Sequence, residues 1–455
     1  MILPPPEKLR RIVFVCRDPI GESLRNAEGI KKLHGVCLLG ICEQPTGAAG
    51  AGVFADLICV ANAHDADQLI EAARTLAGKH GALDRIVTSQ ETLLEAAACA
   101  GATLGLQGLS VATVRRALDK SCLKSALARA GTRTARDSVI TSGADARQFV
   151  DEVGFPIVLK PLNGSGGLAT WCIRTAEQLD LALELMKPSS ERAIFAEDFL
   201  RGEELCLDTI TIANEPLFHS ICCYRPSILE ALEDPRIQWS CVMPRDLDAG
   251  RYADFSEQGL RAVRALKVGN AMTHMEGFLL DEGGVRFTDA TLRPAGARIG
   301  PMLAFAYDID PYFAWARVAV DGCFDGPWER KYAVGTVFLR GIGAGLVAQV
   351  DGVEAMEQRV GELVVEARWP RVGALKSATY TGDGYITVRH PETRVVAEAI
   401  QSIKQTVQIT YSRSDSTAPA NALIAEQWAR RLQYFDQQLN KPAWDSDSLP
   451  SGKEP

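Results

Sequence analysis

A strand-like run that ends in a lysine and leads into a glycine-rich loop is the part of the sequence best suited to bind phosphate. The apolar run Phe155–Lys160 is followed by Asn163–Gly167, which contains three glycines. Glycine lets backbone N–H groups approach phosphate oxygens closely, and a fixed ammonium neutralises their charge. A glycine-rich hairpin is the alternative, because the loop lacks both the Walker ending and the Rossmann spacing. The candidate phosphate-binding residues are Lys160, Gly164, Ser165, Gly166 and Gly167.

Carboxylates stand near the ends of the next two predicted strands. Glu197 closes one strand, and Glu204 precedes the other. A strand end that continues as Phe199-Leu200 would give an edge whose backbone can pair with a flat heterocycle. The carboxylates could then hold an amino group and ribose hydroxyls. A charged turn between two strands is the alternative.

An oxygen-rich face is expected on a predicted hairpin further along the chain. Alternate side chains of a strand share a face, so His274 lies with Glu276, and Asp289 lies with Thr291 and Arg293. Paired strands would bring the carboxylates of Glu276 and Asp289 together, which suits Mg²⁺. Arg293 would be a fixed fork for a phosphate or carboxylate. A solvated polar ladder is the alternative, and the apolar flanking sequence disfavours it.

Two further basic residues are weaker candidates. Lys120 lies within a helix-like segment, where a lysine usually decorates the surface. Arg298 follows Arg293 by five positions and is either a second catalytic arginine or a surface arginine after a turn.

The composition is that of an ordinary globular protein. The 455 residues are 47% hydrophobic and 23% charged, which predicts two to four domains with ample core. A net charge of −8 argues against a nucleic-acid partner. No apolar run approaches the ~20 residues of a membrane span, and the N-terminus lacks signal-peptide features. The twelve cysteines form no Cys-x-x-Cys pair, so a zinc site is not expected, and most of them are predicted to be buried thiols of a reducing cytoplasm.

The first hundred residues alternate short apolar runs with amphipathic segments. This alternation predicts a doubly wound parallel sheet, and the missing Gly-x-Gly-x-x-Gly after the first strand argues against an NAD site. The predicted strands are 11–16, 36–41, 57–60 and 85–88, and the predicted helices are 24–34, 65–81 and 91–100.

The rest of the chain predicts an α+β organisation. A polar, proline-containing stretch at 225–252 is expected to shape a substrate pocket together with the C-terminal domain. The predicted helices are 111–129 (ended by Gly131), 144–153, 176–186, 256–268, 310–322, 393–406 and 420–440. The predicted strands are 134–141, 155–160, 169–174, 193–199, 205–213, 219–224, 273–280, 284–288, 334–339, 346–350, 362–366 and 385–389.

The order of these features resembles the ATP-grasp superfamily, nearest the L-amino-acid ligases of the carboxylate–amine ligase group. A helix lysine, a strand lysine, a glycine loop, a Glu-x-Phe-Leu edge, a second carboxylate, two acidic metal ligands and an arginine follow one another over about residues 110–325. The segments Ile86–Glu91 and Gly105–Gly108 resemble the domain that precedes ATP-grasp domains. The domains implied are a Rossmann-like pre-ATP-grasp domain at 1–108, an ATP-grasp domain at 109–328, a C-terminal β-rich lid domain at 329–440 and a disordered tail at 441–455.

The resemblance also implies roles for individual residues. Lys120 and Lys160 match the two nucleotide-binding lysines, and the loop at 164–167 matches the flap that closes over the phosphates. Arg293 matches the arginine that steadies an acyl phosphate. The adenine and ribose positions are Glu197, Phe199, Leu200 and Glu204. The metal positions are Glu276, Asp289 and Thr291.

Two of the metal positions depart from the family pattern. The family usually has Glu where this chain has Asp289, and Asn where it has Thr291. Aspartate keeps the charge but is one methylene shorter, and a hydroxyl is a poorer Mg²⁺ ligand than an amide oxygen.

The activity implied is an ATP-dependent, ADP-forming ligation of a carboxylate to an amine through an acyl phosphate. The implied cofactors are ATP and Mg²⁺ or Mn²⁺, and the implied setting is a cytoplasmic homodimer without membrane or nucleic-acid partners. Two alternatives stay open: a carboxylase-type or purine-pathway enzyme of the same fold, and a nucleotide-binding homologue with little activity. The missing Ala-Met-Lys-Met biotinylation motif lowers the carboxylase option.

Overall fold

The computed structural model describes residues 9–45, 47, 50, 52–162, 170–234, 236–247, 250–377, 379–413 and 428. The chain divides into two compact units, which are Met1–Ala135 with Leu200–Thr417, and Arg136–Phe199 with Ala418–Pro455. The predicted helix 420–440 (Trp428 apart), the predicted tail 441–455 and the loop glycines 164, 166 and 167 with Ser165 lie outside the described residues.

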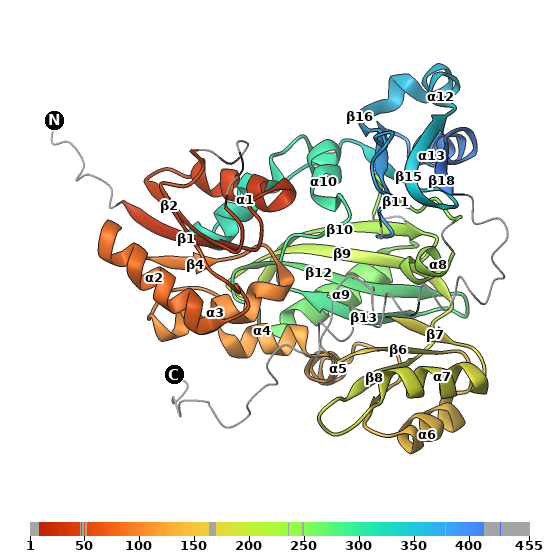
Figure 1. The fold of residues 1–455 in the computed structure, drawn as a ribbon, viewed down its shortest axis with the longest axis horizontal. Coiled ribbons are helices and arrows are strands. Elements are labelled where there is room, and N and C mark those ends of the chain that lie inside the picture. The colour runs from red at the N-terminus through yellow and green to blue at the C-terminus, as the bar shows by residue number, and fades with distance from the viewer. Residues whose placement is uncertain are drawn as a thin grey trace. The chain divides into compact units, whose positions relative to one another are not determined.

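The first unit begins with the predicted parallel sheet (Figure 1). Its strand order is β3-β2-β1-β4, and every pair is parallel. Side chains of β1 alternate, so that Val13 and Val15 face one apolar core while Ile12 and Phe14 face another. The strands are β1 (Arg10–Cys16), β2 (Val36–Cys42), β3 (Asp56–Cys59) and β4 (Arg85–Val87).

Helices cover both faces of this sheet, which confirms the doubly wound prediction. Helix α1 packs on the face of Ile12 and Phe14, and α2 and α3 pack on the other. The helices are α1 (Gly21–Lys31), α2 (Ala66–His80) and α3 (Leu94–Thr103).

The segment predicted as helix 310–322 also returns to this sheet. It forms α11 (Pro311–Ala316) and a π-helical turn, Arg317–Asp321. Trp315 joins the core of Phe14 and α1, with the two ring centroids 6.0 Å apart. A Cβ on Gly29 of α1 would lie 2.4 Å from the Tyr312 carbonyl oxygen, so glycine permits the close approach of α1 and α11.

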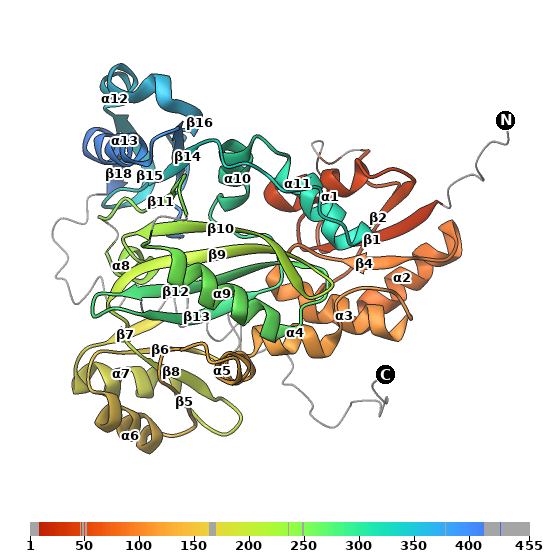
Figure 2. The same cartoon turned by 180° about the vertical axis from the view of Figure 1, so that it is seen from behind.

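A second, antiparallel sheet of eight strands forms most of the first unit. Its order is β13-β12-β9-β10-β11-β14-β17-β16. Leu205 and Leu207 of β9 face the core that contains α9, whereas Cys206 faces the core that contains α10, because alternate residues point to opposite faces. Figure 2 shows α9 lying along this sheet. The strands are β9 (Gly202–Ile212), β10 (Glu215–Arg225), β11 (Ser240–Met243), β12 (Ala271–Leu280), β13 (Val285–Thr291), β14 (Ala333–Leu339), β16 (Val364–Arg368) and β17 (Gly384–His390).

The remaining elements of the first unit surround this sheet. Helix α13 packs on β14 and β17 with an apolar stripe that includes Val396, Ile400 and Ile403. A separate two-stranded sheet joins β15 (Ala344–Asp351) to β18 (Gln408–Arg413). The other helices are α8 (Ile228–Glu233), α9 (Ala253–Leu266), α10 (Ile299–Tyr307), α12 (Val353–Val360) and α13 (Thr393–Thr406).

The prediction of one helix over 111–129 is wrong, because the helix is interrupted at Asp119. This residue is extended (ψ 117°) and separates α4 (Val111–Leu118) from α5 (Lys120–Arg129). Its carboxylate accepts a hydrogen bond from the Cys122 N–H at 2.8 Å and so caps α5. The interruption makes Lys120 the first residue of a helix. Gly131, predicted to end the helix, has a φ of +71°.

The second unit contains a four-stranded antiparallel sheet of order β5-β8-β6-β7. Helices α6 and α7 share one apolar core with it, built around Phe149, Leu159 and Trp171, and the described Trp428 joins that core. The elements are β5 (Asp137–Ile140), α6 (Gly143–Val153), β6 (Ile157–Pro161), β7 (Trp171–Ile173), α7 (Ala176–Met186) and β8 (Ile194–Asp198).

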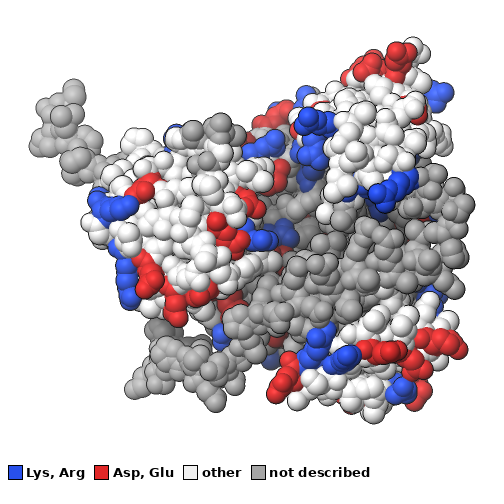
Figure 3. Space-filling model, viewed as in Figure 1, with Lys and Arg blue, Asp and Glu red and all other residues white. Residues whose placement is uncertain are grey.

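Charged side chains of both signs are mixed over the described residues on the face seen in Figure 3. None of the helices in the described part of the chain is long and apolar enough to cross a membrane.

Candidate functional site

Four of the residues predicted to do chemistry share one face of the β12–β13 hairpin. The strand register pairs Glu276 with Asp289 and His274 with Thr291, as the alternation of the sequence predicts. A bulge follows Glu276, and a Cβ on Gly277 would lie only 2.6 Å from the Arg286 carbonyl oxygen. The hairpin therefore brings two carboxylates, an imidazole and a hydroxyl to one place.

Lys120 joins this group from the start of α5. Its Nζ lies 3.1 Å from Oδ2 of Asp289, and its side chain is only 3% exposed. A buried ammonium needs a negative partner, and Asp289 supplies one. The surface alternative for Lys120 is therefore wrong, although its predicted contact with a nucleotide stays a prediction.

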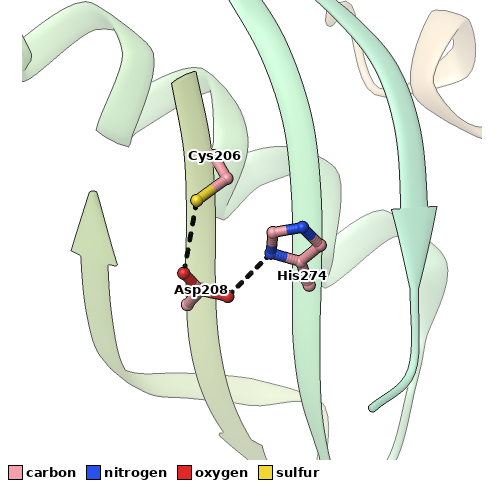
Figure 4. A group of neighbouring side chains, drawn as sticks. All are labelled: Cys206, Asp208 and His274. Atoms are coloured by element: carbon pink, nitrogen blue, oxygen red, sulfur yellow. Dashed lines mark hydrogen bonds and ion pairs between the residues drawn. The ribbon is translucent and has the colours of Figure 1, made fainter. Parts of the chain in front are cut away.

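Behind Glu276, a chain of buried polar groups runs across β12, β9 and β10. Nδ1 of His274 lies 2.8 Å from Oδ1 of Asp208, and Nε2 lies 3.4 Å from Oε1 of Glu276. The Tyr224 hydroxyl donates to the same Glu276 oxygen at 3.2 Å. Figure 4 shows Asp208 and His274 pointing toward each other from neighbouring strands. Oε1 of Glu276 is therefore fixed in position by His274 and Tyr224.

The opposite charges of Asp208, His274 and Glu276 stabilise one another. Burial alone would lower the pKa of His274, but the charge of Asp208 and its hydrogen bond, with Cys206 and Glu276, hold that pKa well above its ordinary value. Burial alone would raise the pKa of Glu276, but the hydrogen bond and charge of His274, with Tyr224 and Arg293, hold it below its ordinary value. The favoured state is an imidazolium between two carboxylates.

Cys206 extends this row of hydrogen-bonded side chains. Cysteine, aspartate and histidine are also common metal ligands, so Cys206, Asp208 and His274 could in principle bind a metal ion. The Sγ of Cys206 donates to Oδ2 of Asp208 at 3.5 Å, and the ligand atoms of Cys206, Asp208 and His274 lie within 4.8 Å of one another (Figure 4). Burial raises the pKa of the Cys206 thiol well above its ordinary value, which disfavours the thiolate that a metal requires. The arrangement is that of a hydrogen-bonded chain.

Oxygen ligands suited to Mg²⁺ are present on the hairpin. Thr291 is 4% exposed, and its Oγ1 has no hydrogen-bond partner among the described residues. A buried hydroxyl without a partner is costly, so this oxygen fits a position that a ligand completes. The carboxylates of Glu276 and Asp289 lie on the same face. The three oxygens therefore fit Mg²⁺ by ligand type.

Arg293 is held by an acidic residue from the first sheet's neighbourhood. Its Nε and Nη2 lie 3.1 and 2.8 Å from Oε2 of Glu91, and its Nη1 donates to the Pro294 carbonyl at 2.7 Å. Burial alone would lower the pKa of Arg293, but the charge of Glu91 and its hydrogen bond, with Glu276, raise it. Arg293 therefore keeps its charge in a partly buried position, with its side chain 19% exposed, as an anion-binding residue requires.

Arg298 is not a surface arginine. Its side chain is 13% exposed, its Nη2 pairs with Glu366, and its Cζ lies 3.8 Å from the centroid of the Tyr385 ring. Its Nε is buried and has no hydrogen-bond partner among the described residues. Ala297 and Arg298 both have left-handed backbone angles (φ 47° and 62°), a conformation that costs about 1–3 kcal/mol per residue. Its catalytic role stays a prediction.

Glu204, the predicted ribose carboxylate, lies on the same face of β9 as Cys206 and Asp208. It is 8% exposed, and its Oε2 accepts a hydrogen bond from the Ile228 N–H at 2.7 Å. Helix α8 therefore begins against this carboxylate. The polar stretch 225–252, in which no helix or strand was predicted, contains α8 and β11.

The second unit holds its predicted residues on adjacent strands. Lys160 of β6 forms an ion pair with Glu197 of β8, and its Nζ lies 5.8 Å from the Phe195 ring centroid. Phe199 donates its N–H to the Pro156 carbonyl at 3.3 Å. Lys160 and Glu197 therefore compensate each other's charge, and their contacts with a nucleotide stay predictions.

Three residues of the site were not predicted from the sequence. Asp208, Tyr224 and Tyr380 lack a recognisable motif, although Asp208 continues the alternation of Glu204 and Cys206 along β9. Burial raises the pKa of Tyr380, with Glu276 also contributing, and its ring centroid lies 4.9 Å from that of Trp239. Only the pairing of β9 with β10 and β12 brings Asp208 and Tyr224 to Glu276.

Known proteins resemble this chain in sequence over about half its length. The family model "Carbamoyl-phosphate synthase L chain, ATP binding domain" matches residues 119–205. Alanine–anticapsin ligase of Bacillus subtilis is 25% identical over 261 residues, 54% of this chain and 55% of that protein. An L-arginine-specific L-amino acid ligase of Bacillus subtilis is 24% identical over 249 residues, 53% of this chain and 59% of that protein. The chain thus spans a little over half the length of these curated relatives.

Solved structures resemble the fold over most of the chain. L-amino acid ligase from Bacillus licheniformis matches with a TM-score of 0.72 at 18% identity, covering 90% of this chain and all of that chain (100%). The biotin carboxylase domain of the Hydrogenobacter thermophilus 2-oxoglutarate carboxylase, in complex with MgADP, ADP and bicarbonate, matches with a TM-score of 0.62 at 15% identity, covering 89% and 91%. The predicted resemblance is confirmed: the chain has the fold of the ATP-grasp enzymes, and L-amino-acid ligases are among the proteins it resembles.

Proposed function

We propose that this protein is an ATP-dependent, ADP-forming ligase that joins a small carboxylate to an amine, with amino acids as the substrate class. The observation that carries the proposal is the face shared by Glu276, Asp289 and Thr291, beside which a partly buried, charged Arg293 is held by Glu91. The sequence and fold similarity to L-amino-acid ligases supports the same activity.

The reaction proceeds in two steps. An oxygen of the substrate carboxylate attacks the γ-phosphorus of ATP, the bond to the ADP oxygen breaks, and an acyl phosphate forms. The amine nitrogen then attacks the acyl carbon and loses a proton, and phosphate leaves with the bonding electrons. Catalysis of both steps is mostly positioning and charge stabilisation.

The residues of the first unit would bind and orient the reacting groups. Glu276 and Asp289, with the hydroxyl of Thr291, would hold Mg²⁺, which neutralises phosphate charge when bound. The ammonium of Lys120, which donates to Asp289 at 3.1 Å, would turn to a phosphate oxygen. Arg293 would hold the acyl phosphate and the oxyanion of the second step. Arg298 is proposed as a further anion-binding arginine.

The nucleotide contacts are proposed residue by residue. Lys160 and the loop at 164–167 would bind phosphates, Glu197 with Phe199 and Leu200 would contact adenine, and Glu204 would bind the ribose. The cytoplasm is the proposed location and a homodimer the proposed assembly, which the mass of the particle in light scattering would test.

Phosphate release tests the activity. Purified protein is incubated with ATP, Mg²⁺ and pairs drawn from a panel of amino acids, and the products are identified by mass spectrometry. Release above background with a matching dipeptide supports the ligase. Mg²⁺-dependent ATP binding without release for any pair would instead favour a nucleotide-binding protein of low activity.

A further inference from the structure

A cavity on the α13 side of the eight-stranded sheet is lined by three basic residues, two of which have no acidic partner within ion-pair distance among the described residues. Its open volume is about 450 Å³, within the ~300–1,000 Å³ common for small-molecule sites. It is lined from α13, from the start of β18, from the residues just after β14 and from those just before β11. None of the described residues that line it is acidic. Its polar and charged lining residues are Arg236, Gln238, Arg340, Lys404, Gln408 and Thr410.

Two of these cations are largely buried and bonded only to carbonyl groups. Arg340 donates from Nη1 to the carbonyls of Ala231 (2.7 Å) and Ile237 (3.1 Å). Lys404 donates from Nζ to the Arg225 carbonyl at 3.0 Å. Burial lowers the pKa of Arg340, and burial lowers that of Lys404 from its ordinary value of 10.5 to about 8. Neither group has a carboxylate within ion-pair distance among the described residues, and the more distant charges of Asp234 and Asp383 offset the burial of Arg340 only in part.

The cations of the proposed active site are compensated differently. Arg293 pairs with Glu91, and Lys120 pairs with Asp289. Within the described part of the chain, no carboxylate lies within ion-pair distance of Arg340 or Lys404. The cavity therefore offers two cations that a bound anion could neutralise.

A residue that lines the cavity, Gln238, has a buried amide oxygen that adds a second requirement. Gln238 is 9% exposed, and its Nε2 donates to the Val407 carbonyl at 2.8 Å. This bond fixes the amide so that Oε1 is the remaining atom, and Oε1 has no hydrogen-bond partner among the described residues. The ligand that completes the cavity thus carries negative oxygens for the two cations and a hydrogen-bond donor for Gln238.

We propose that this cavity is a binding site for a phosphate group, as the free monohydrogen phosphate ion or as a small phosphate ester with a neighbouring hydroxyl. Monohydrogen phosphate satisfies both requirements, because its charged oxygens accept from Arg340 and Lys404 while its P–OH donates to Gln238. Arg236 lies at the exposed rim, where Asp234 already pairs with it at 2.7 Å. The site is separate from the proposed ATP-binding residues and does not depend on ligase activity.

Arg340 connects the cavity to helix α8 and to the segment before β11 through its hydrogen bonds. The two carbonyls that it binds lie at the end of α8 and just before β11, and α8 begins at Ile228, which donates to Glu204. A phosphate that draws on Arg340 competes with those carbonyls. The proposal is an anion-binding site, and binding is its direct test.

Protection of Lys404 from acylation measures binding at this place. Full-length protein is treated at pH 8 with an amine-acylating reagent at constant ionic strength, and the modified peptides are quantified by mass spectrometry. For a Kd of about 1 mM, about 10 mM phosphate should slow acylation of Lys404 about tenfold. The exposed Lys31 and Lys79 should be unaffected. Equal rates in phosphate and chloride, or equal slowing at all three lysines, would overturn the proposal.

Ligand and protein controls sharpen this test. Sulfate has nearly the size and charge of monohydrogen phosphate but no proton to donate, so it should protect Lys404 less. Glycerol phosphate and succinate separate a phosphate ester and a dicarboxylate from the free ion. Protection by succinate as strong as by phosphate would contradict the assignment.

Equilibrium dialysis with radiolabelled phosphate provides an independent measurement. Lys404→Gln should lose one binding equivalent, whereas Arg394→Gln, which removes an exposed charge from the same helix, should keep it. Undiminished binding to Lys404→Gln would refute the site even if the variant labels normally elsewhere.

Discussion

Glu91 and Arg293, 202 positions apart in the chain, form an ion pair in which two guanidinium nitrogens share one carboxylate oxygen at 3.1 and 2.8 Å. Glu91 follows the first parallel sheet, and Arg293 follows the hairpin that carries the candidate metal ligands. The pair sets the direction of the guanidinium. The segment Ile86–Glu91, which the sequence singles out only by its family resemblance, therefore has a structural role at the candidate site: its last residue orients Arg293.

Replacing Glu91 should impair catalysis more than folding. In Glu91→Gln the guanidinium keeps an acceptor but loses the charge that holds it, so kcat for phosphate release should fall by about ten- to a hundredfold. Glu95→Gln is the matched control, because Glu95 lies four residues after Glu91, at the start of α3, and pairs with Arg115 of α4. Steady-state kinetics and thermal unfolding are measured for both variants. Equal kcat values for Glu91→Gln and the wild type would rule out the positioning role.

The unpartnered hydroxyl of Thr291 predicts a graded response to Mg²⁺. Thr291→Asn supplies an amide oxygen and should lower the Mg²⁺ concentration at half-maximal activity, whereas Thr291→Val removes the oxygen and should raise it. A Mg²⁺ titration of phosphate release at saturating ATP measures both. If the two variants shift the midpoint in the same direction, Thr291 is not a metal ligand.

Removing one candidate metal ligand should abolish turnover. Glu276→Ala should reduce phosphate release to background, because two negative ligands hold Mg²⁺ far better than one. Glu282→Gln is the control, since it removes a carboxylate from the exposed turn of the same hairpin. Full activity in Glu276→Ala would exclude the proposed metal site.

The buried pair of Asp208 and His274 should contribute strongly to stability. Asp208→Asn leaves a buried imidazolium without its main partner, so the free energy of unfolding should fall by about 3–5 kcal/mol. Urea denaturation followed by circular dichroism measures the change, and Asp281→Asn on the exposed β12–β13 turn should change little. A loss below about 1 kcal/mol, the level of exposed ion pairs, would mean that the pair is solvated.

Lys404 should make the stability depend on alkaline pH. Its pKa is about 8 in the folded protein and 10.5 ordinarily, so the unfolded chain binds more protons between these values. The free energy of unfolding therefore rises with pH across this window, by up to about 3 kcal/mol relative to Lys404→Met. Denaturation of both proteins at pH 7, 9 and 10.5 gives the difference. A constant difference would place Lys404 in solvent.

The sequence predicts the elements whose residues carry a strong period, and it misses those defined by tertiary contacts. The parallel strands, α7 and α13 follow from local patterning. Helix α10 is apolar almost throughout, so it shows no helical stripe, and the short β11 is a strand only because it lies between β10 and β14. Asp119 reads as part of a helix although its side chain caps the next one.

The site shows the same division. Alternation places Glu276 with His274, and hairpin pairing adds Asp289 and Thr291. Tyr224 and Glu91 come from strands and helices whose neighbours cannot be known without the sheet order. Short motifs therefore predict ligand atoms, whereas the groups that orient those atoms depend on long-range pairing.

The strand order of the eight-stranded sheet limits which truncations and chimeras of this protein can fold. Strand β11 is hydrogen-bonded on one side to β10 and on the other to β14, where Ser240 pairs with Val337 and Met243 with Val334. Strand β14 begins ninety residues after the end of β11, and α10 and α11 lie between them in the sequence. A chain ended before β14 would leave an open strand edge available to other molecules. The C-terminal segment is therefore no exchangeable module, and chimeras that alter substrate choice must transfer it together with β11 and β10.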